Sequence, residues 1–254
     1  MSDTSYKEIL LCSTPRSGST FLAEAMFNTG CMGCPDEFFN NDQKNKGDRE
    51  HTIYEENYKK VGAESYADYV VKLGEHYKSD NGVHSVKMHF QHFHQALRSG
   101  YFQRPAERFY VFIHRQDVAA QAASLAIAIK TQKWNSRMKT PKVENLEVPD
   151  ELLARAYRDL TFDNLRWKAF FEMFNTPYIS LEYDEITADV GAAVKKIAKH
   201  AGIKLKKGAL DGLEKRITGK KQSGGLNSDL KNRLTGMTLG DYAAGNIMFD
   251  TKVL

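Results

Sequence analysis

Cysteine is scarce in this chain, which has three in 254 residues: Cys12, Cys31 and Cys34. Cys31 and Cys34 have the C-x-x-C spacing of zinc and redox sites, but no second cysteine pair exists to complete a zinc site. The sequence therefore favours neither a metal nor redox chemistry at this pair. We expect a reduced protein in the cytoplasm.

No apolar run approaches the roughly 18 residues that a membrane helix needs. Residues 1–7 are polar, unlike a targeting segment. The sequence therefore predicts no stable membrane insertion.

A strong excess of charge of one sign is also lacking, because 36 basic and 32 acidic residues leave a net charge of +4. Binding to nucleic acid would require a basic stripe. The lysine-rich stretch 204–221 is the one candidate, and a solvated helix face explains it equally well. We therefore expect no nucleic-acid partner.

The pattern of apolar residues predicts an α/β fold. Apolar runs bounded by turns predict strands at residues 8–12, 82–89, 108–114 and 177–183. Helical spacing predicts helices at residues 20–29, 65–76, 117–134, 149–174 and 189–200. Continuously apolar strands that alternate with helices are typical of one parallel sheet flanked by helices on both faces.

The length and composition fit a single domain over residues 1–254, with 41% hydrophobic and 27% charged residues. Residues 40–62 are polar and weakly patterned, and we interpret them as a loop or lid. From about residue 219 the glycine-rich tail is expected to be irregular.

The segment Ser-Thr-Pro-Arg-Ser-Gly-Ser-Thr at residues 13–20 joins the first strand to the first helix. Gly18 lets backbone N–H groups turn inward, and the helix start offers unpaired N–H groups and a positive dipole end. Arg16 adds a permanent charge with a planar fork for phosphate or sulfate oxygens. An ordinary turn that binds nothing is the alternative, but Arg16 at the centre favours an anion site.

A second anion site is predicted at Arg115, where the strand at 108–114 ends. Arg115 would bind a phosphate through two parallel hydrogen bonds, and Gln121 and Ser124 on the next helix would add neutral donors. An ion pair between Arg115 and Asp117 is the alternative.

Two carboxylates, Asp36 and Glu37, precede the aromatic pair Phe38 and Phe39 after the first helix. Partial burial close to the loop at Arg16 would raise the pKa of a carboxyl group, as a general base requires. Alternatively, Asp36 caps a turn and Glu37 is a structural partner of Arg16.

Lys87 lies in the strand at 82–89, where a lysine would stabilise a negative group or form a buried ion pair. Four histidines are nearby, namely His84, His89, His92 and His94. A strand places His84 and His89 on opposite faces, and no carboxylate cluster accompanies them, so a metal is not favoured. Lining of a substrate pocket is the other interpretation, and we assign it to His89.

Taken together, the motifs resemble those of sulfotransferases that use 3′-phosphoadenosine-5′-phosphosulfate (PAPS). The segment Thr-Pro-Arg-Ser-Gly-Ser-Thr is similar to their 5′-phosphosulfate loop. It is followed in order by Pro-x-Glu-Phe-Phe, Gly-x-x-x-x-Lys-Met and His-Arg-x-Asp-x-x-x-Gln-Ala-x-Ser. This set, over residues 9–202, is most similar to the mycobacterial trehalose 2-sulfotransferase group.

The resemblance implies a P-loop-like sheet, PAPS as donor, no metal, and a small hydroxyl acceptor, here a carbohydrate or glycolipid. Glu37 would act as the base, and Arg16 and Lys87 would stabilise charge. The loop residues that would hold the phosphosulfate are Pro15, Arg16, Ser17, Gly18, Ser19 and Thr20. Arg115 would hold the 3′-phosphate with Gln121 or Ser124. The acceptor would lie against Asp36, Glu37, Phe38, Phe39 and His89.

Other features of the resemblance leave alternatives open. Pro15 and Cys34 replace a glutamine and an acidic residue of the trehalose group, so the acceptor need not be trehalose. Dimerisation in that group leaves a homodimer as an open alternative. A P-loop kinase is disfavoured because no lysine follows Gly18 in the G-x-x-x-x-G-K-[ST] pattern. A non-catalytic nucleotide-binding module is a further alternative. The presence of Glu37, Arg16 and Arg115 together argues against it.

Overall fold

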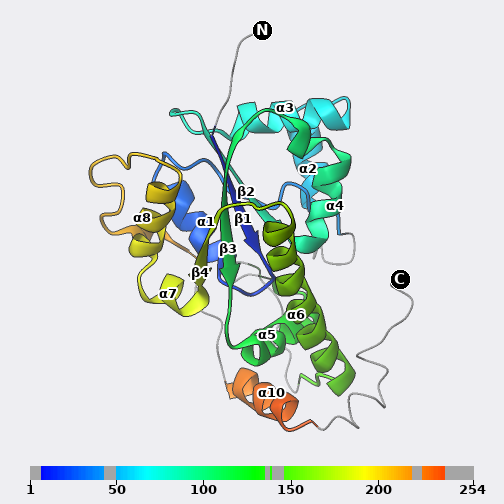
Figure 1. Ribbon diagram of the computed structural model, residues 1–254. Helices are drawn as coiled ribbons and strands as arrows, with labels where there is room; N and C mark the ends of the chain where they lie inside the picture. Colours follow the sequence, from blue (N-terminus) through cyan, green and yellow to red (C-terminus); the bar gives the residue numbers. More distant parts are fainter. Residues whose placement is uncertain (1–6, 43–49, 135–137, 139–145, 219–224, 238–254) are drawn as a thin grey trace.

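The computed structural model describes residues 7–42, 50–134, 138, 146–218 and 225–237. Its centre is a parallel sheet with the strand order β2-β1-β3-β4 (Figure 1). The strands are β1 (Lys7–Ser13), β2 (Val83–His89), β3 (Glu107–His114) and β4 (Tyr178–Glu182). The α/β fold expected from the sequence is confirmed, and each strand begins and ends within one residue of its predicted bounds.

The strands are buried from both sides because their residues are apolar on both faces. Ile9 and Leu11 of β1 belong to the core on one face, and Leu10 and Cys12 belong to the core on the other. All four are almost inaccessible to solvent. This is the burial expected of a parallel sheet between two helical layers.

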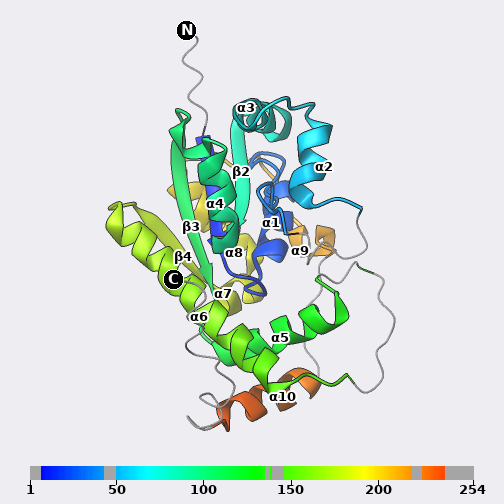
Figure 2. The ribbon, with the colours of Figure 1, turned by 90° about the vertical axis from the view of Figure 1, so that its right-hand side faces the viewer.

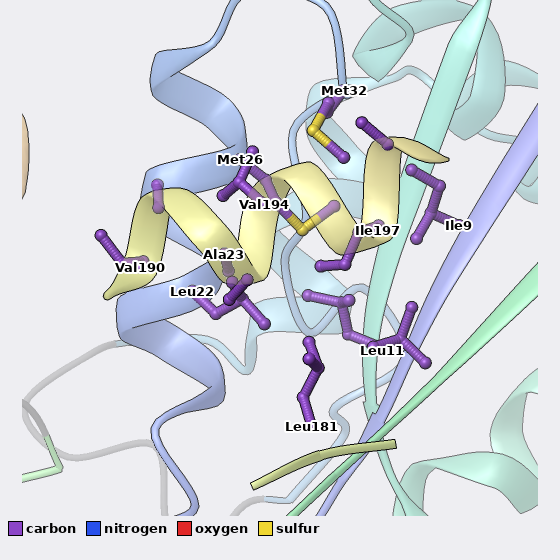
Figure 3. Packing of buried hydrophobic residues seen from close by; sticks show 14 of the residues in the cluster. Ile9, Leu11, Leu22, Ala23, Met26, Met32, Leu181, Val190, Val194 and Ile197 are labelled. Atoms are coloured by element: carbon purple, nitrogen blue, oxygen red, sulfur yellow. The ribbon is translucent and has the colours of Figure 1, made fainter. Parts of the chain in front are cut away.

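The first layer packs α1 against α8 over the sheet. It consists of α1 (Ser19–Asn28), α7 (Tyr183–Ala188), α8 (Val190–His200) and α9 (Leu213–Arg216). Leu22 and Met26 of α1 meet Val194 and Ile197 of α8 above Leu11 (Figure 3). Complete burial of such a side chain stabilises the fold by about 1.5–3 kcal/mol, which fixes α1 and the loop before it.

The second layer is rich in aromatic residues. It consists of α2 (Ile53–Lys60), α3 (Tyr66–Tyr77), α4 (Phe90–Arg98), the 3-10 helix η1 (Tyr101–Gln103) and α6 (Asp150–Met173). The buried Trp167 of α6 donates its indole N–H to the carbonyl oxygen of Ser13 at 3.0 Å. This bond attaches α6 to the carboxyl end of β1, where the loop at 14–18 begins.

A third group of helices lies beyond the carboxyl end of β3. Figure 2 shows α5 (Val118–Thr131) beside α6 and α10 (Gly225–Thr235). Leu230 and Leu234 of α10 are buried in the core that α5 and α6 share. Lys231 lies 2.7 Å from Asp117 at the start of α5.

The tail therefore differs from the irregular segment expected from about residue 219. Leu230 and Leu234 are one helical turn apart, so a helix buries both side chains on the same face. This packing accounts for a helix in a glycine-rich sequence. Residues 219–224 and 238–254 lie outside the described residues, so the expectation for them is not addressed.

The expected loop or lid at residues 40–62 also contains a helix. Thr52 caps α2 by accepting a hydrogen bond from the Glu55 backbone N–H, and the Glu55 carboxylate accepts one from the Thr52 N–H. Tyr54 of this helix is buried against Tyr69. The second half of the segment is thus part of the second layer, and residues 43–49 lie outside the described residues.

The segment between α1 and Phe38 runs along β2. The Ser85 hydroxyl donates to the carbonyl oxygen of Met32 at 2.6 Å, and the Lys87 N–H donates to that of Asp36 at 3.0 Å. Gly33 makes this approach feasible, since a Cβ atom there would lie 2.8 Å from the Ser85 nitrogen. Its φ of 71° also favours glycine.

The junction of β2 with α4 contains a buried imidazole. The His89 backbone N–H donates to Nδ1 of His92 at 3.4 Å. Burial lowers the pKa of His92 to about 3, and the nearby Glu37 carboxylate offsets this only in part. The imidazole is therefore neutral in the folded protein.

We expect Gly33→Ala to destabilise the protein by about 2 kcal/mol or more, because left-handed strain and the clash with Ser85 add together. Gly30→Ala is the matched control, since Gly30 has a φ of 68° and open space around its Cβ position. It should cost only about 1 kcal/mol. Urea denaturation measures both, and equal costs would show that the docking of this segment on β2 does not require glycine.

We expect acid to destabilise the protein through His92. The unfolded chain binds a proton near the ordinary pKa of 6.5, whereas the folded chain does so only at about 3, so stability falls as pH decreases through this window. The slope from this group is up to about 1.4 kcal/mol per pH unit. His92→Gln, which retains an acceptor, should flatten the measured pH dependence of unfolding. Parallel curves for the variant and the wild type would contradict the assignment.

Candidate active site

The loop between β1 and α1 has the backbone of an anion cradle. Arg16 and Gly18 have left-handed conformations, with φ values of 64° and 82°. The Ser17 hydroxyl donates to the carbonyl oxygen of Thr14 at 2.8 Å and closes the turn. The start of α1 has neither a side-chain cap nor an acidic residue in its first turn. Its N–H groups are therefore directed at the space that an anion would occupy.

Tyr183, at the start of α7, lies between the loop and Arg115. A Cβ atom on Gly18 would lie 3.0 Å from the Tyr183 ring. The Arg115 guanidinium packs over the same ring, 4.4 Å from its centre. The carboxyl ends of β1, β3 and β4 thus meet at one place, as the parallel topology requires.

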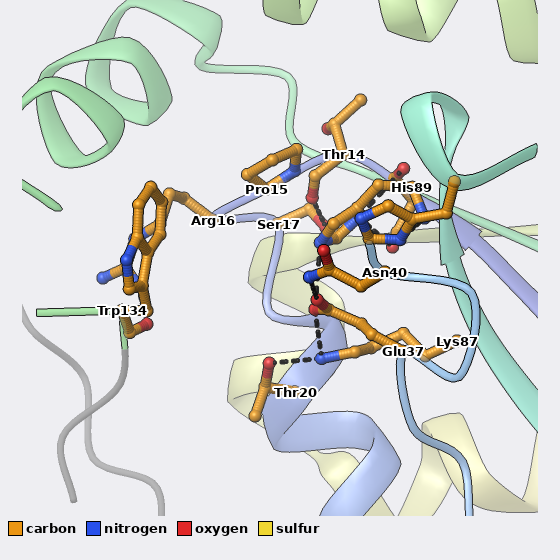
Figure 4. A network of polar contacts seen from close by, with 12 residues as sticks. Thr14, Pro15, Arg16, Ser17, Thr20, Glu37, Asn40, Lys87, His89 and Trp134 are labelled. Atoms are coloured by element: carbon orange, nitrogen blue, oxygen red, sulfur yellow. Dashed lines mark hydrogen bonds and ion pairs between the residues drawn. The ribbon is translucent and has the colours of Figure 1, made fainter. Parts of the chain in front are cut away.

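The Arg16 side chain extends toward α5 and away from Glu37 and Lys87 (Figure 4). Its Nε donates to the Ser124 hydroxyl at 3.0 Å, and its Nη1 donates to the carbonyl oxygen of Trp134 at 2.5 Å. Burial lowers the pKa of the Arg16 guanidinium, Tyr183 opposes this, and the charge of Arg115 lowers the pKa further. Two neighbouring guanidinium groups repel each other, and a bound anion would relieve that repulsion.

Gln121 and Ser124, the two helix residues considered for the 3′-phosphate, have different surroundings in the structure. Gln121 is fully buried, and its Nε2 donates to the Thr14 hydroxyl at 2.9 Å and to the carbonyl oxygen of Pro15 at 2.7 Å. It therefore supports the loop from inside. Ser124, in contrast, contacts the Arg16 guanidinium.

Glu37 lies at the centre of a polar network on the other side of the loop (Figure 4). Its Oε1 is 2.9 Å from Lys87 Nζ and 3.2 Å from His89 Nε2, and its Oε2 accepts from Asn40 Nδ2 at 2.6 Å. Lys87 also donates to the Thr20 hydroxyl at 2.8 Å. Lys87 and His89 reach the same carboxylate because alternate residues of a strand point to the same face.

Backbone pairing with β2 brings Glu37 to this position. Asp36 forms an isolated parallel bridge with Val86, and its exposed carboxylate accepts from the Glu37 N–H at 2.8 Å. Phe38 and Phe39 are fully buried in the second core. They anchor the segment in the core, and their side chains point away from the polar network around Glu37.

The ionisation of Glu37 is controlled by its neighbours. Burial alone would raise the pKa of this carboxyl, but the Lys87 ammonium and His89 outweigh burial and hold the pKa well below its usual range. Glu37 is therefore a carboxylate at neutral pH. The imidazole of His89 is fixed by its Nδ1, which lies 3.1 Å from the Ser13 hydroxyl.

The other histidine and cysteine patterns do not form part of this network. His84 lies 3.3 Å from the buried Glu8, which also pairs with Arg104 and Arg108 at the opposite end of the sheet. Cys31 and Cys34 are free thiols, and burial raises the pKa of Cys34 to about 11. Within the described ranges, no group of three or more His, Cys, Asp or Glu could hold a metal ion.

Several contacts of the site could not be assigned from sequence. Asn40 directly follows the Pro-x-Glu-Phe-Phe motif, and His92 belongs to the histidine group considered for a metal, but neither pattern predicts a contact with Glu37. Tyr183 ends a predicted strand, and the charged residues next to it are acidic, so they do not indicate an anion site. Position at the carboxyl end of a strand was the one available signal for Tyr183. As for a membrane, no helix among the described residues is long and apolar enough to span one.

Comparison with solved structures finds matches at low identity. The sulfotransferase STF1 from Mycobacterium tuberculosis is 15% identical, with a TM-score of 0.47 over 92% of this chain and 77% of that one. The sulfotransferase domain of the Synechococcus olefin synthase is 13% identical, with a TM-score of 0.43 over 94% and 91%. A retinol dehydratase in complex with retinol and PAP is 15% identical, with a TM-score of 0.47 over 97% and 83%.

No curated protein is a significant match to the chain. The family model of the Stf0 sulphotransferases, however, matches residues 8–234. That match includes the anion loop at residues 14–18, Glu37, Lys87 and Arg115, and it ends within the last turn of α10. The chain belongs to the Stf0 sulphotransferase family and is a PAPS-dependent sulfotransferase.

Proposed function

We propose that the protein transfers the sulfonyl group of PAPS to a hydroxyl of a small carbohydrate or glycolipid acceptor. The observation that carries this proposal is that Lys87 contacts both the anion loop side, at Thr20, and the Glu37 carboxylate. Lys87 Nζ is 2.8 Å from the Thr20 hydroxyl and 2.9 Å from the Glu37 carboxylate. A carboxylate thus lies one side chain away from the anion cradle.

The residues present fit a doubly phosphorylated donor. The inward N–H groups at residues 17–20 and the start of α1 suit the 5′-phosphosulfate. Arg115, Ser124 and the Arg16 guanidinium form a separate positive cluster that suits the 3′-phosphate. When bound, PAPS supplies an activated sulfonyl group with a phosphate as its leaving group.

Glu37 is the proposed general base. It would accept the proton of the acceptor hydroxyl as the new oxygen–sulfur bond forms and the bond between sulfur and the phosphate oxygen breaks. Lys87 and the loop N–H groups would stabilise charge on the sulfonyl and phosphate oxygens. His89, held by Ser13, would orient the carboxylate that accepts the proton.

The surroundings of Glu37 favour a hydroxylated acceptor. Asn40 and His89 contact the carboxylate, and Asp36 is exposed beside it. Phe38 and Phe39 are buried in the core, so they offer no open apolar wall.

Incubation with PAPS and a panel of disaccharides, glycolipids, phenols and apolar alcohols, followed by mass spectrometry, identifies the acceptor class. Sulfo transfer to phenols or apolar alcohols alone would contradict a carbohydrate.

We expect Glu37→Gln to lower kcat by about 100-fold or more, because loss of a general base costs roughly 10²–10⁴-fold. Its affinity for 3′-phosphoadenosine-5′-phosphate (PAP) should not fall below the wild-type value, since the loop that would hold the nucleotide is intact. Glu75→Gln, on the exposed surface of α3, is the control and should turn over normally. Near-normal turnover by Glu37→Gln would show that another group takes the proton.

We expect Arg115→Lys and Ser124→Ala each to weaken PAP binding while leaving AMP binding unchanged. Only PAP has the 3′-phosphate, and loss of a charged hydrogen bond costs about 1.5–3 kcal/mol, or roughly tenfold or more in Kd. Calorimetric titration of both nucleotides measures the difference, with Lys130→Ala at the far end of α5 as the control. An equal loss for PAP and AMP would place the 3′-phosphate elsewhere.

A further inference from the structure

Lys87 contacts both halves of the site at once. Its ammonium donates to the Thr20 hydroxyl on α1 and pairs with the Glu37 carboxylate delivered by the segment along β2 (Figure 4). The side chain is nearly buried, with 6% of its surface exposed, so it cannot exchange these partners for bulk water. A group that binds in the loop and contacts this ammonium therefore changes the electrostatic surroundings of Glu37.

The pairing weakens Glu37 as a base in the absence of donor. A carboxylate in contact with an ammonium group binds protons poorly, and proton transfer is most efficient when the pKa of the base lies nearer the working pH. The groups that face Glu37 are Lys87 and His89 from β2, His92 from α4 and the Asn40 amide. Asp163 of α6 also interacts electrostatically with His89.

We propose that Lys87 couples donor binding to proton abstraction, by turning its ammonium from Glu37 toward the anionic oxygens of the donor in the loop. This inference rests on the proposed function, because it assumes that Glu37 is the base. It assigns Lys87 a second role beyond stabilising charge on the transferred group. The base then becomes competent only when the donor is in place.

Charge and reach both support this exchange. The phosphosulfate has two negative charges against one on Glu37, and it would lie beside Thr20, which the ammonium already contacts. Lysine has a flexible four-carbon stem and three N–H groups, so it can change partners without a change in the backbone. Once the ammonium turns away, less positive charge opposes the effect of burial, and the pKa of Glu37 rises.

The coupling also gives the site an order of events. Before the donor binds, an acceptor hydroxyl meets a carboxylate whose lone pairs are engaged by Lys87 and His89. After the donor binds, one of those partners has moved to the sulfonyl side. Proton removal and sulfonyl transfer therefore take place in the same complex. Glu37 becomes a stronger base only when the Lys87 ammonium contacts the negative charge of the bound donor.

The test is the number of protons taken up when PAP binds. Binding enthalpies measured at one pH in buffers with different ionisation enthalpies give this number, and the measurement is repeated between about pH 5 and pH 7. Wild-type protein should take up more protons than Glu37→Gln, by up to about half a proton where the pH equals the raised pKa of Glu37. Subtraction of the Glu37→Gln result removes the titration of the PAP phosphates themselves, whose pKa lies near 6.

Lys87→Met is the matched variant for the lysine. Without an ammonium to move, Glu37 is already partly protonated before PAP binds, so the proton uptake should fall toward that of Glu37→Gln. The affinity for PAP, obtained from the same titrations, shows that each variant is folded and binds nucleotide.

The outcomes separate this inference from the function on which it rests. If PAP binds and wild type and Glu37→Gln take up equal numbers of protons, the coupling is overturned while the sulfotransferase proposal stands. If Lys87→Met retains the full wild-type uptake, Lys87 is not the coupling group. If PAP does not bind to the wild-type protein, the proposed donor site fails and the coupling fails with it.

Discussion

The ion pair between Lys87 and Glu37 is the interaction on which the candidate site depends. It joins the segment after α1 to β2 and brings a carboxylate within one side chain of the anion loop. A buried carboxylate without such a partner would be protonated or would destabilise the fold. The pair thus keeps Glu37 ionised where little water reaches it, and its strength depends on what occupies the loop.

The loop itself separates two electrostatic environments. On one side, Arg16, Arg115 and Ser124 form a positive cluster. On the other side, positive and negative groups are balanced around Glu37. An adenosine carrier with phosphates at both ends suits this division, because its two anionic ends require different surroundings from the reacting hydroxyl.

Most differences between expectation and structure concern where a side chain points. Sequence patterns located the strands, α1, α5, α6 and α8, because apolar periodicity is a local property. They could not show that Phe38 and Phe39 enter the core, or that Gln121 supports the loop from inside. They also missed α10, whose two buried leucines have no strong periodic signal in a glycine-rich tail.

The sequence by itself determined the α/β fold, the anion loop and the residue types of the site, since strand–loop–helix signals depend on near neighbours. Tertiary structure decided which of those residues meet. Docking of residues 31–37 along β2, made feasible by Gly33, pairs Glu37 with Lys87, and packing of α5 turns Arg16 away from both. Contacts between segments far apart in the chain follow from how the layers pack, and no local pattern encodes that packing.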